Sequence, residues 1–580
     1  MAIIPSQSGI NLKSAPKKHS MEQDKLRPPA ETVAWVRERF ALMGQNVLKE
    51  VRRIDSGRLD IPVYISLCGH QASALTGTAK QMGKGASSSQ AEASALMELA
   101  ERFSFFSYMR QTPFEHLTAS QAPAPRMEFS QVAHSLHHPA SALEAARQAF
   151  EALPQRWAWA RNLTAGREEA VPLDWFYAIN EYNGPSAGNC QAEALLQSLC
   201  EVIERHVSAL VSLERRRSPA IDPQSVREPV ARELLDKFAR QGIQVFLKDY
   251  SLGLGVPTVA ALCYDPASFP AQSEIVYTAG TAASPAMALI RALTEVAQLA
   301  GDFQTGSSYK VSALPKFANL REAAYVMEAA GQVALDSLPD ISRDDFRDEV
   351  MACVAALREK GFTAYSLDVS HERLQVPAVY SFVPGFHFAE RTTGTDVVFH
   401  AAKLASQLPD PEQALQVLED MAQAAPEVYY LPFFRALALI NLERPAEALA
   451  ELERALALNP PASDASSIHT QRGVALKDLG FFAEAQEALG RAAAYAEPHP
   501  EVFNLLGFCL FKQKRYEQAI EAFSRAIELD PGQAINYANI GTNLRELGRI
   551  PEACEMYAHA LELDPELDFA RENLERLRGQ

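Results

Sequence analysis

Three Ala- and Leu-rich segments of this 580-residue chain carry carboxylates and arginines where a buried helix would ordinarily have apolar residues. The first segment, ASALMELAERFSFF, begins at Ala93. At about 100° per residue, its polar side chains fall on one narrow stripe. They are Ser94, Glu98, Glu101 and Arg102. Apolar residues cover the remaining surface, so the pattern predicts a helix with an acidic stripe on a buried face.

Two further segments repeat this design. One side of NGPSAGNCQAEALLQSLCEVIERH carries Asn189, Glu193, Glu201, Glu204 and Arg205. In AMALIRALTEVAQLA the polar residues stand at positions i, i+4 and i+7, and they are Arg291, Glu295 and Gln298. The alternative interpretation is a solvated helix face with local Glu–Arg pairs. Such a face usually carries several Lys and Asp residues, which are almost absent from these segments.

If the three stripes meet, six glutamates and three arginines share one cavity with a formal charge of −3. Such a cavity requires protonated acids or bound cations. Ligand sets made only of oxygen select hard ions, above all Mg²⁺. Arginines among these acids suit the phosphate groups of a nucleotide. The composition of the cavity therefore predicts Mg-ATP as its ligand.

A glycine-rich run, GTAKQMGKG, precedes the first acidic segment. It is not a phosphate-binding loop, because Met82 stands at the position of the second glycine and Gly85 at that of the required Ser or Thr. We interpret it as a flexible entry to the helix, with Lys84 within reach of a phosphate. The alternative is that Lys84 is an ordinary turn lysine.

The elements that must position these residues form two domains and a tail. Residues 1–30 are rich in Ser, Pro, Lys and Gln without periodicity, which predicts a disordered tail. Residues 31–395 alternate strand-like runs such as IPVYISLC, VPTVAALCY and VPAVYSFVPG with helical stretches, which predicts an α+β domain.

Residues 396–580 are expected to form an all-α solenoid. Glycines recur every 34 residues, and alanines and prolines keep the same period. The glycines are Gly473, Gly507 and Gly541. These spacings resemble the tetratricopeptide repeat and predict about five repeats followed by a polar capping helix, ARENLERLRGQ. Such an array normally recruits a polypeptide, and the alternative is a rigid arm that stabilises a dimer.

Composition excludes several other classes of function. Hydrophobic residues make up 47% of the chain, which is enough for sizeable cores. The net charge of −17 argues against nucleic acid and membrane surfaces as partners. The seven scattered cysteines indicate neither a disulfide framework nor a zinc site. With no signal peptide and no membrane-spanning run in the sequence, we expect a cytoplasmic protein.

The runs GKGASSSQAEASALMELAER, NGPSAGNCQAEALLQSLCEVIER, RALTEVAQ and VPAVYSFVPG, in this order, resemble the YcaO superfamily. The resemblance implies ATP-dependent phosphorylation of a backbone amide oxygen, after which a nucleophile takes its place. It implies Mg²⁺ ligands at Glu98, Glu101, Glu201 and Glu204. It also implies nucleotide contacts at Ser94, Asn189, Glu193, Arg205, Arg291 and Glu295, and, with a looser match, at Arg102 and Gln298.

The segments RPPAETVAWVRERF and RRIDSGRLDIPVY are most similar to the subgroup that makes thioamides with TfuA-like proteins. Members that form azolines end in a proline-rich PxPxP tail, whereas this chain ends in NLERLRGQ, which favours another nucleophile. A second similar subgroup carries C-terminal helical repeats and is implicated in methylthiolation of a ribosomal protein, which implies a sulfur transferase as partner. A scaffold with a degenerate nucleotide sensor is the alternative from another class. We expect a homodimer, and the sequence leaves the general base open, with His387 as one candidate.

Overall fold

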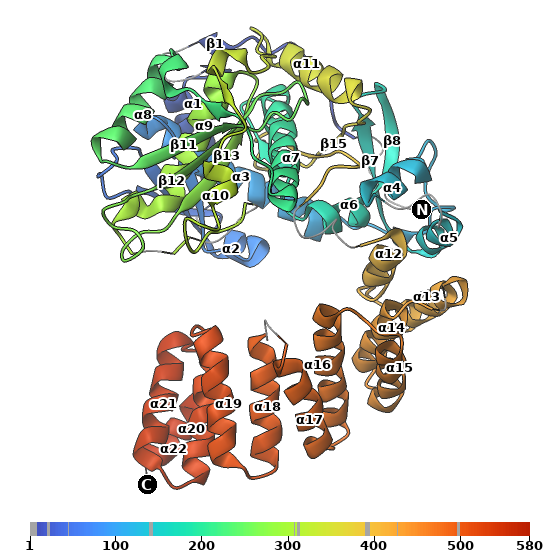
Figure 1. Ribbon diagram of the computed structural model, residues 1–580. Coiled ribbons are helices and arrows are strands. Elements are labelled where there is room, and N and C mark those ends of the chain that lie inside the picture. The colour runs from blue at the N-terminus through green and yellow to red at the C-terminus, as the bar shows by residue number, and fades with distance from the viewer. Residues whose placement is uncertain are drawn as a thin grey trace. The chain divides into compact units, whose positions relative to one another are not determined.

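The computed structural model describes residues 8–19, 24–44, 46–137, 143–306, 308–309, 314–388, 395–425, 427–495 and 499–579. Its contacts divide the chain into two compact units. The first consists of Met1–Leu143 and Pro154–Val397, and the second of Glu144–Leu153 and Val398–Gln580. The first unit is a mixture of sheets and helices and the second is helical (Figure 1). The predicted combination of an α+β domain and an all-α solenoid is thus confirmed.

The described part of the first unit contains three main sheets. In the first sheet, all pairs are antiparallel and the strands are β3 (Leu48–Arg53), β4 (Val63–Cys68) and β5 (Lys80–Lys84). The second sheet has the order β13 (Val276–Thr281), β12 (Thr258–Tyr264), β11 (Gln244–Asp249), β10 (Ala220–Ile221) and β14 (Gln332–Val333). The third has the order β6 (His116–Leu117), β7 (Gln155–Asn162), β15 (Tyr365–Asp368), β16 (Ala378–Phe382) and β9 (Pro185–Ala187), with β8 (Arg167–Pro172) paired to β7. A small ribbon joins β1 (Lys18–His19) to β2 (Asp24–Lys25).

Helices pack on these sheets. They are α1 (Pro29–Met43), α2 (His70–Thr76), α3 (Ser88–Gln111), α4 (Phe129–Ser135), α6 (Leu173–Asn180), α7 (Gln191–Glu214), α8 (Pro229–Arg240), α9 (Pro285–Ala300), α10 (Ala324–Met327) and α11 (Phe346–Glu359). The three segments with acidic stripes correspond to α3, α7 and α9. Helix α3 packs on β5, α7 on β16 and β9, and α9 on β13. Because α9 also contacts β5 and α7 also contacts β13, the three helices share neighbours.

The acidic helices begin in one common way, directly after a strand. Ser87 caps α3 by accepting the N–H of Gln90, and Ser284 caps α9 by accepting that of Met287. Such caps satisfy backbone donors that the first helical turn leaves unpaired. Two glycines let the helices approach the preceding strands. A Cβ at Gly83 would lie 2.0 Å from the backbone N of Ala95, and one at Gly280 would lie 2.4 Å from a carbonyl oxygen in α9.

The predicted disorder of residues 1–30 is wrong for the described residues between 8 and 18, which we call the N-terminal strap. The Ser8 carbonyl accepts the backbone N–H of Asp368, and Ala15 and Lys17 exchange backbone hydrogen bonds with residues 344–346. Ser8 and Ala15 are buried. Composition misled here because the strap is held mainly by backbone hydrogen bonds and a few polar side chains, and these leave no apolar periodicity in the sequence.

The second unit consists of the short helix α5 (Leu143–Ala152), which lies mostly within it, and a series of helical hairpins (Figure 1). The hairpin helices are α12 (Val397–Ala405), α13 (Pro411–Ala424), α14 (Tyr430–Asn441), α15 (Pro445–Ala457), α16 (Ala462–Asp478), α17 (Phe482–Ala493), α18 (Pro500–Lys512), α19 (Tyr516–Leu529), α20 (Ala534–Glu546) and α21 (Ile550–Leu563), followed by α22 (Asp568–Arg578). The periodic glycines mark the crossing points within hairpins. A Cβ at Gly473 or Gly507 would lie 2.5 or 2.7 Å from the side chain of Leu489 or Phe523.

Across the described part of both units, no helix is long and apolar enough to cross a membrane.

Candidate functional site

The acidic stripe of α3 is held by one arginine. The Nε atom of Arg102 lies 3.2 Å from Oε1 of Glu98 and 3.3 Å from Oε1 of Glu101. The second guanidinium edge is also engaged, because Nη1 of Arg102 donates to the carbonyl oxygen of Tyr182 at 2.8 Å. The predicted stripe is therefore a set of neighbouring charges on the inner side of the helix, and only a small part of the Arg102 side chain is exposed.

Helix α7 has a similar arrangement of one arginine between two glutamates. Two nitrogen atoms of Arg205 lie 3.8 Å from Oε1 of Glu201 and Oε1 of Glu204. The other oxygen of Glu201 accepts the N–H of Gly184 at 3.2 Å. The turn at 182–184 thus contacts α3 through Arg102 and α7 through Glu201, and it links the two acidic helices.

Helix α9 and strand β5 supply the third side of the site. Lys84 at the end of β5 forms an ion pair with Glu295 of α9. Arg291 donates from Nη1 to Oε1 of Gln197 on α7 at 2.6 Å. Glu204 accepts the N–H of Thr281, the last residue of β13, at 3.2 Å. Contacts therefore join β5 to α9, α9 to α7, and α7 to β13.

The charges of α3, α7 and β5 act on one another. Burial raises the pKa of Glu101 well above its ordinary value, and the charges of Glu98 and Glu201 raise it further against the opposing effect of Arg102. Burial also raises the pKa of Glu201, although Arg205 and Arg102 act in the opposite direction. Carboxylates of two helices thus share one electrostatic environment, and in the absence of a cation this environment favours their protonated forms.

The same environment acts on Lys84. Burial lowers its pKa to about 7, and the positive charge of Arg291 contributes in the same direction. The negative charges of Glu204 and Glu98 oppose this shift. Groups on all three acidic helices therefore act on this one side chain.

Asn189 and Glu193, at the start of α7, face the N-terminal part of the chain. Asn189 donates from Nδ2 to both carboxylate oxygens of Glu193 at 3.1 and 3.3 Å. Its own Oδ1 accepts the hydroxyl of Thr32 at 2.9 Å. The Nζ atom of Lys25 lies 3.5 Å from Oε1 of Glu193. Sequence analysis missed both residues, because Lys25 belongs to the two-residue strand β2 and Thr32 to the first turn of α1, and neither stands in a motif.

The two remaining predicted residues are less engaged. Ser94 and Gln298 lie one turn from Glu98 and Glu295 on the same helices, and both are half-buried. Within the described residues, neither side chain makes a hydrogen bond to the charged set. Their assignment as nucleotide contacts stays a prediction.

A cavity of about 70 Å³ opens beside this charged set. It is lined by the strap, β2, α7, the β13–α9 connection, α9 and the start of α11. Its charged lining residues are Lys17, Lys25, Glu193, Arg291 and Glu349. A second, smaller cavity is lined by Glu204, Arg205 and Glu295 together with Tyr277 and Tyr309. Arg291 lines the first cavity and Glu295 lines the second, so predicted nucleotide contacts lie in both.

The residues present suit a polyphosphate with its divalent ion. The Nε atoms of Arg205 and Arg291 are buried and have no hydrogen-bond partner among the described residues, and a guanidinium in this state suits phosphate oxygens. The carboxylates offer hard oxygen ligands. In the described ranges, no three His, Cys, Asp or Glu side chains are arranged to hold a metal ion. Because Arg102 and Arg205 lie next to these glutamates, Mg²⁺ would compete with the two guanidinium groups for them.

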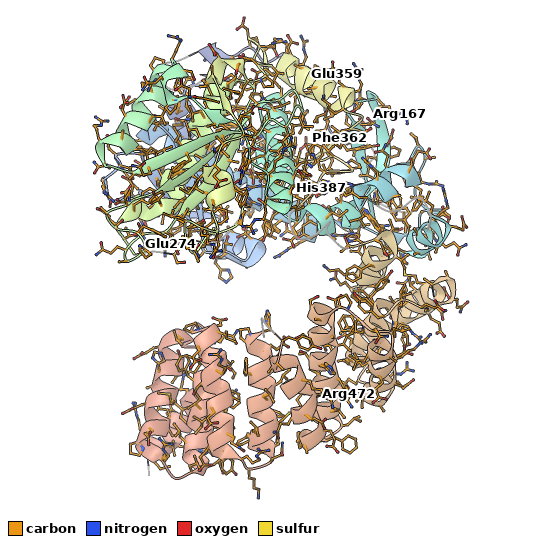
Figure 2. All side chains as sticks on the ribbon, viewed as in Figure 1. Arg167, Glu274, Glu359, Phe362, His387 and Arg472 are labelled. Carbon is orange, nitrogen blue, oxygen red and sulfur yellow. The ribbon has the colours of Figure 1, made fainter. Side chains whose placement is uncertain are left out.

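His387, the candidate general base, lies in an aromatic stack. Its ring stacks on that of His137 with a centroid distance of 3.9 Å, and its backbone N–H donates to Nδ1 of His206 at 2.9 Å. His387 and Phe362, both labelled in Figure 2, contact the ring of His206 on α7. Burial lowers the pKa of His387. These contacts are with aromatic rings rather than with the acidic set, and a role as base stays a prediction.

Comparison with known proteins identifies the class. The model of the family described as YcaO cyclodehydratase, ATP- and Mg²⁺-binding, matches residues 82–387, which is more than half of the chain. The chain belongs to the YcaO family, and ATP and Mg²⁺ are the ligands of that family. Two tetratricopeptide repeat models match residues 470–534 and 534–567. The sequence-based assignment to a YcaO domain with C-terminal tetratricopeptide repeats is confirmed.

Particular relatives are more distant. An uncharacterized protein of Methanothermobacter thermautotrophicus is 29% identical over 62% of this chain and 93% of its own length. An uncharacterized protein in the tfuA 3′ region of Rhizobium leguminosarum bv. trifolii is 29% identical over 26% of this chain. The ribosomal protein S12 methylthiotransferase accessory factor YcaO of Escherichia coli is 25% identical over 37% of it. The match spans only 39% and 38% of the lengths of the latter two proteins.

A solved structure shares the fold. It is a heterocyclase in complex with substrate and cofactor, is 22% identical, and superposes with a TM-score of 0.53 over 65% of this chain and 54% of its own. At this level of identity the similarity concerns the fold alone.

Proposed function

We propose that this protein uses Mg-ATP to phosphorylate the oxygen of a backbone amide in a peptide or protein, for thioamide formation or a related modification. The repeats recruit the polypeptide substrate or a partner enzyme. The observation that carries the proposal is the convergence of the charged residues of α3, α7 and α9 beside a cavity.

Within this proposal, the four paired glutamates hold Mg²⁺, and they are Glu98, Glu101, Glu201 and Glu204. The nucleotide is held by Lys84, Ser94, Arg102, Asn189, Glu193, Arg205, Arg291, Glu295 and Gln298. We add Lys25 and Thr32, because their contacts with Glu193 and Asn189 place them beside this set. Arg102 and Arg205 keep the glutamates in place when the ion is absent, and they are then available to neutralise phosphate.

Bound ATP supplies a phosphoryl group that converts the amide oxygen, a poor leaving group, into phosphate. The surrounding side chains orient the nucleotide and exclude water from it. Arginines and lysines held in a buried site stabilise developing negative charge more strongly than they would in water. Because burial and the neighbouring carboxylates raise the pKa of Glu101, a bound cation would lower it again.

The relative encoded next to tfuA supports thioamide formation with a TfuA-like partner as the specific reaction. A second candidate is favoured by the Escherichia coli relative, which is named as an accessory factor of ribosomal protein methylthiolation. In that case the chain binds ATP and assists a separate sulfur-transferring enzyme, which carries out the modification.

Substitution of Glu201 and Glu204 by Gln tests the nucleotide site. We expect Mg²⁺-dependent ATP binding to weaken by more than about 100-fold, because several charge-assisted contacts are lost together. Binding is measured with a fluorescent ATP analogue, and hydrolysis by phosphate release. Glu214→Gln, at the exposed end of the same helix, is the matched control. Wild-type affinity in the double variant would contradict the site assignment.

The reaction itself is tested with a co-expressed TfuA-like protein and the peptides that co-purify with the full chain. Replacement of an amide oxygen by sulfur gives a defined mass increase, which is localised by fragmentation. Modification that requires this chain, ATP and a sulfide source supports the first candidate. If a variant of this chain with a disabled ATP site still allows the modification at a reduced rate, the accessory role is supported.

A further inference from the structure

The N-terminal strap brings a lysine into the cavity beside the charged set. Lys17 and Glu349 form an ion pair in which Nζ and Oε1 lie 2.5 Å apart, and their side chains are 3% and 0% exposed. The Lys17 ammonium also lies 4.9 Å from the centre of the Phe346 ring. Both members of the pair line the cavity that Glu193 and Arg291 also line.

The strap is fixed so that Lys17 has little freedom to leave. The N–H of Lys17 donates to the carbonyl oxygen of Asp344, and the N–H of Phe346 donates to that of Ala15. The N–H of Ala15 donates to the carboxylate of Asp345 at 3.0 Å. This short antiparallel contact sets the register of the strap on the start of α11, and the register determines which strap residue faces the cavity.

The charge balance of the cavity favours an anion. Three cationic side chains line it, against the two carboxylates Glu193 and Glu349. Glu193 already accepts from Asn189 and from the backbone N–H of Leu26, and Glu349 accepts the backbone N–H of Arg343 at 3.0 Å. The cations are Lys17, Lys25 and Arg291. An anionic group that enters the cavity therefore meets more positive charge than negative charge.

We propose that Lys17, which the strap brings to the cavity, is a nucleotide-binding residue. Its ammonium group leaves the carboxylate of Glu349 and contacts a phosphate of ATP instead. The inference rests on the proposed nucleotide site and adds a residue to it. Glu349 holds the lysine in the cavity while the site is empty, and it competes with the nucleotide for the same ammonium group. The strap closes one side of the cavity through the same contacts.

Opposite effects from the two partners of one ion pair test this proposal. Glu349→Gln keeps a carbonyl oxygen for the N–H of Arg343 but removes the competing charge. We expect it to tighten ATP binding about threefold. Lys17→Met should weaken ATP binding about tenfold, in keeping with the loss of one charge-assisted contact.

A double variant separates binding from folding. Lys17→Met alone leaves a buried carboxylate without its cation, which destabilises the fold. Lys17→Met with Glu349→Gln removes both charges, and we expect its ATP affinity to remain about tenfold below that of the wild type. Recovery of wild-type affinity in the double variant would show that Lys17 only neutralises Glu349, and this result would overturn the proposal.

Controls on the strap and on the ligand complete the design. Lys13→Met removes the same charge from an exposed position of the strap and should leave binding unchanged. Adenosine, which has no phosphate, should compete equally well in every variant, and an equal loss of adenosine binding would overturn the phosphate contact. If the wild-type protein binds no ATP, the proposed function fails as well. If the wild-type protein binds ATP and the double variant binds it equally well, the Lys17 contact is contradicted and the proposed function is not.

Discussion

Arginine–glutamate pairs occur in both units, and their surroundings give them different consequences. In α3, Arg102 joins two glutamates at a buried face, and its charge is one of several that act on Glu101 and Glu201. At the start of α21, Arg549 pairs with Glu552 three residues later, and about half of each side chain is exposed. Water screens the charges of the exposed pair. The charges of the Arg102 cluster are screened less, so they act on neighbouring ionisable groups. The same two residue types thus mark a candidate site in one unit and a solvated surface in the other.

The largest effect is expected from a substitution that disturbs the close packing of α3 on β5, in the unit that contains the buried charges. Gly83→Ala places a methyl group 2.0 Å from the backbone N of Ala95, so α3 must move away from β5. We expect a loss of about 3 kcal/mol in stability and a loss of ATP binding of more than about 100-fold, because Lys84 follows directly. Tryptophan fluorescence in urea measures the first unit alone, since all four tryptophans lie in it.

Gly490→Ala is the matched control for this substitution. No atom lies within 4 Å of its added Cβ, and Gly490 is inside helix α17 of the second unit. Alanine is the better helix former, so this variant should be about 0.5 to 1 kcal/mol more stable. Normal ATP binding by Gly83→Ala would contradict the requirement for close contact between α3 and β5.

The ionisation of the buried acids provides a second test. Because the pKa of Glu101 is raised in the folded protein, its contribution to stability is complete below the ordinary carboxylate pKa and is lost as the pH rises through the raised value. The ligand-free first unit should therefore lose stability with rising pH, by at most about 1.4 kcal/mol per pH unit for each proton. Denaturant midpoints across pH measure this slope.

Glu101→Gln should flatten the slope, and Mg²⁺ with ATP should reduce it in the wild type. The exposed Glu115→Gln variant is the control and should keep the original slope. A slope that Glu101→Gln leaves unchanged would assign the effect to other groups.

A smaller effect is expected in the repeats. Gly507→Ala places a methyl group 2.7 Å from the Phe523 ring, and a side chain is able to shift where a backbone is not. We expect a cost of about 1 to 2 kcal/mol, confined to the second unit. Far-UV circular dichroism should detect it, while tryptophan fluorescence and ATP affinity stay at wild-type values. A change in ATP affinity would show that the two units are coupled.

The smallest effect is expected at the exposed pair. Arg549→Ala should produce no measurable shift in either unfolding transition, because exposed ion pairs of this kind contribute little. The comparison is Arg102→Ala, which leaves the half-buried Glu98 and the more deeply buried Glu101 without their common cation. Equal effects of the two variants would remove the distinction between the buried and exposed pairs.

The sequence was sufficient for the three acidic helices, because their stripes depend on helical spacing alone. It was also sufficient for the repeats, since a period of 34 residues specifies stacked hairpins. It was insufficient for Lys17 and Lys25, because no local pattern shows which distant surface a polar segment covers. The sequence also did not show that arginines pair with the predicted Mg²⁺ ligands, since such ion pairs depend on the side-chain conformations.

The stacking of the repeats has a mechanical consequence. Each helix from α13 to α22 makes its most extensive contacts with the helices next to it along the chain, and the periodic glycines are buried at these crossings. Tension applied to the C-terminus would therefore peel hairpins away one after another, starting with α22, and lengthen the molecule in small reversible steps.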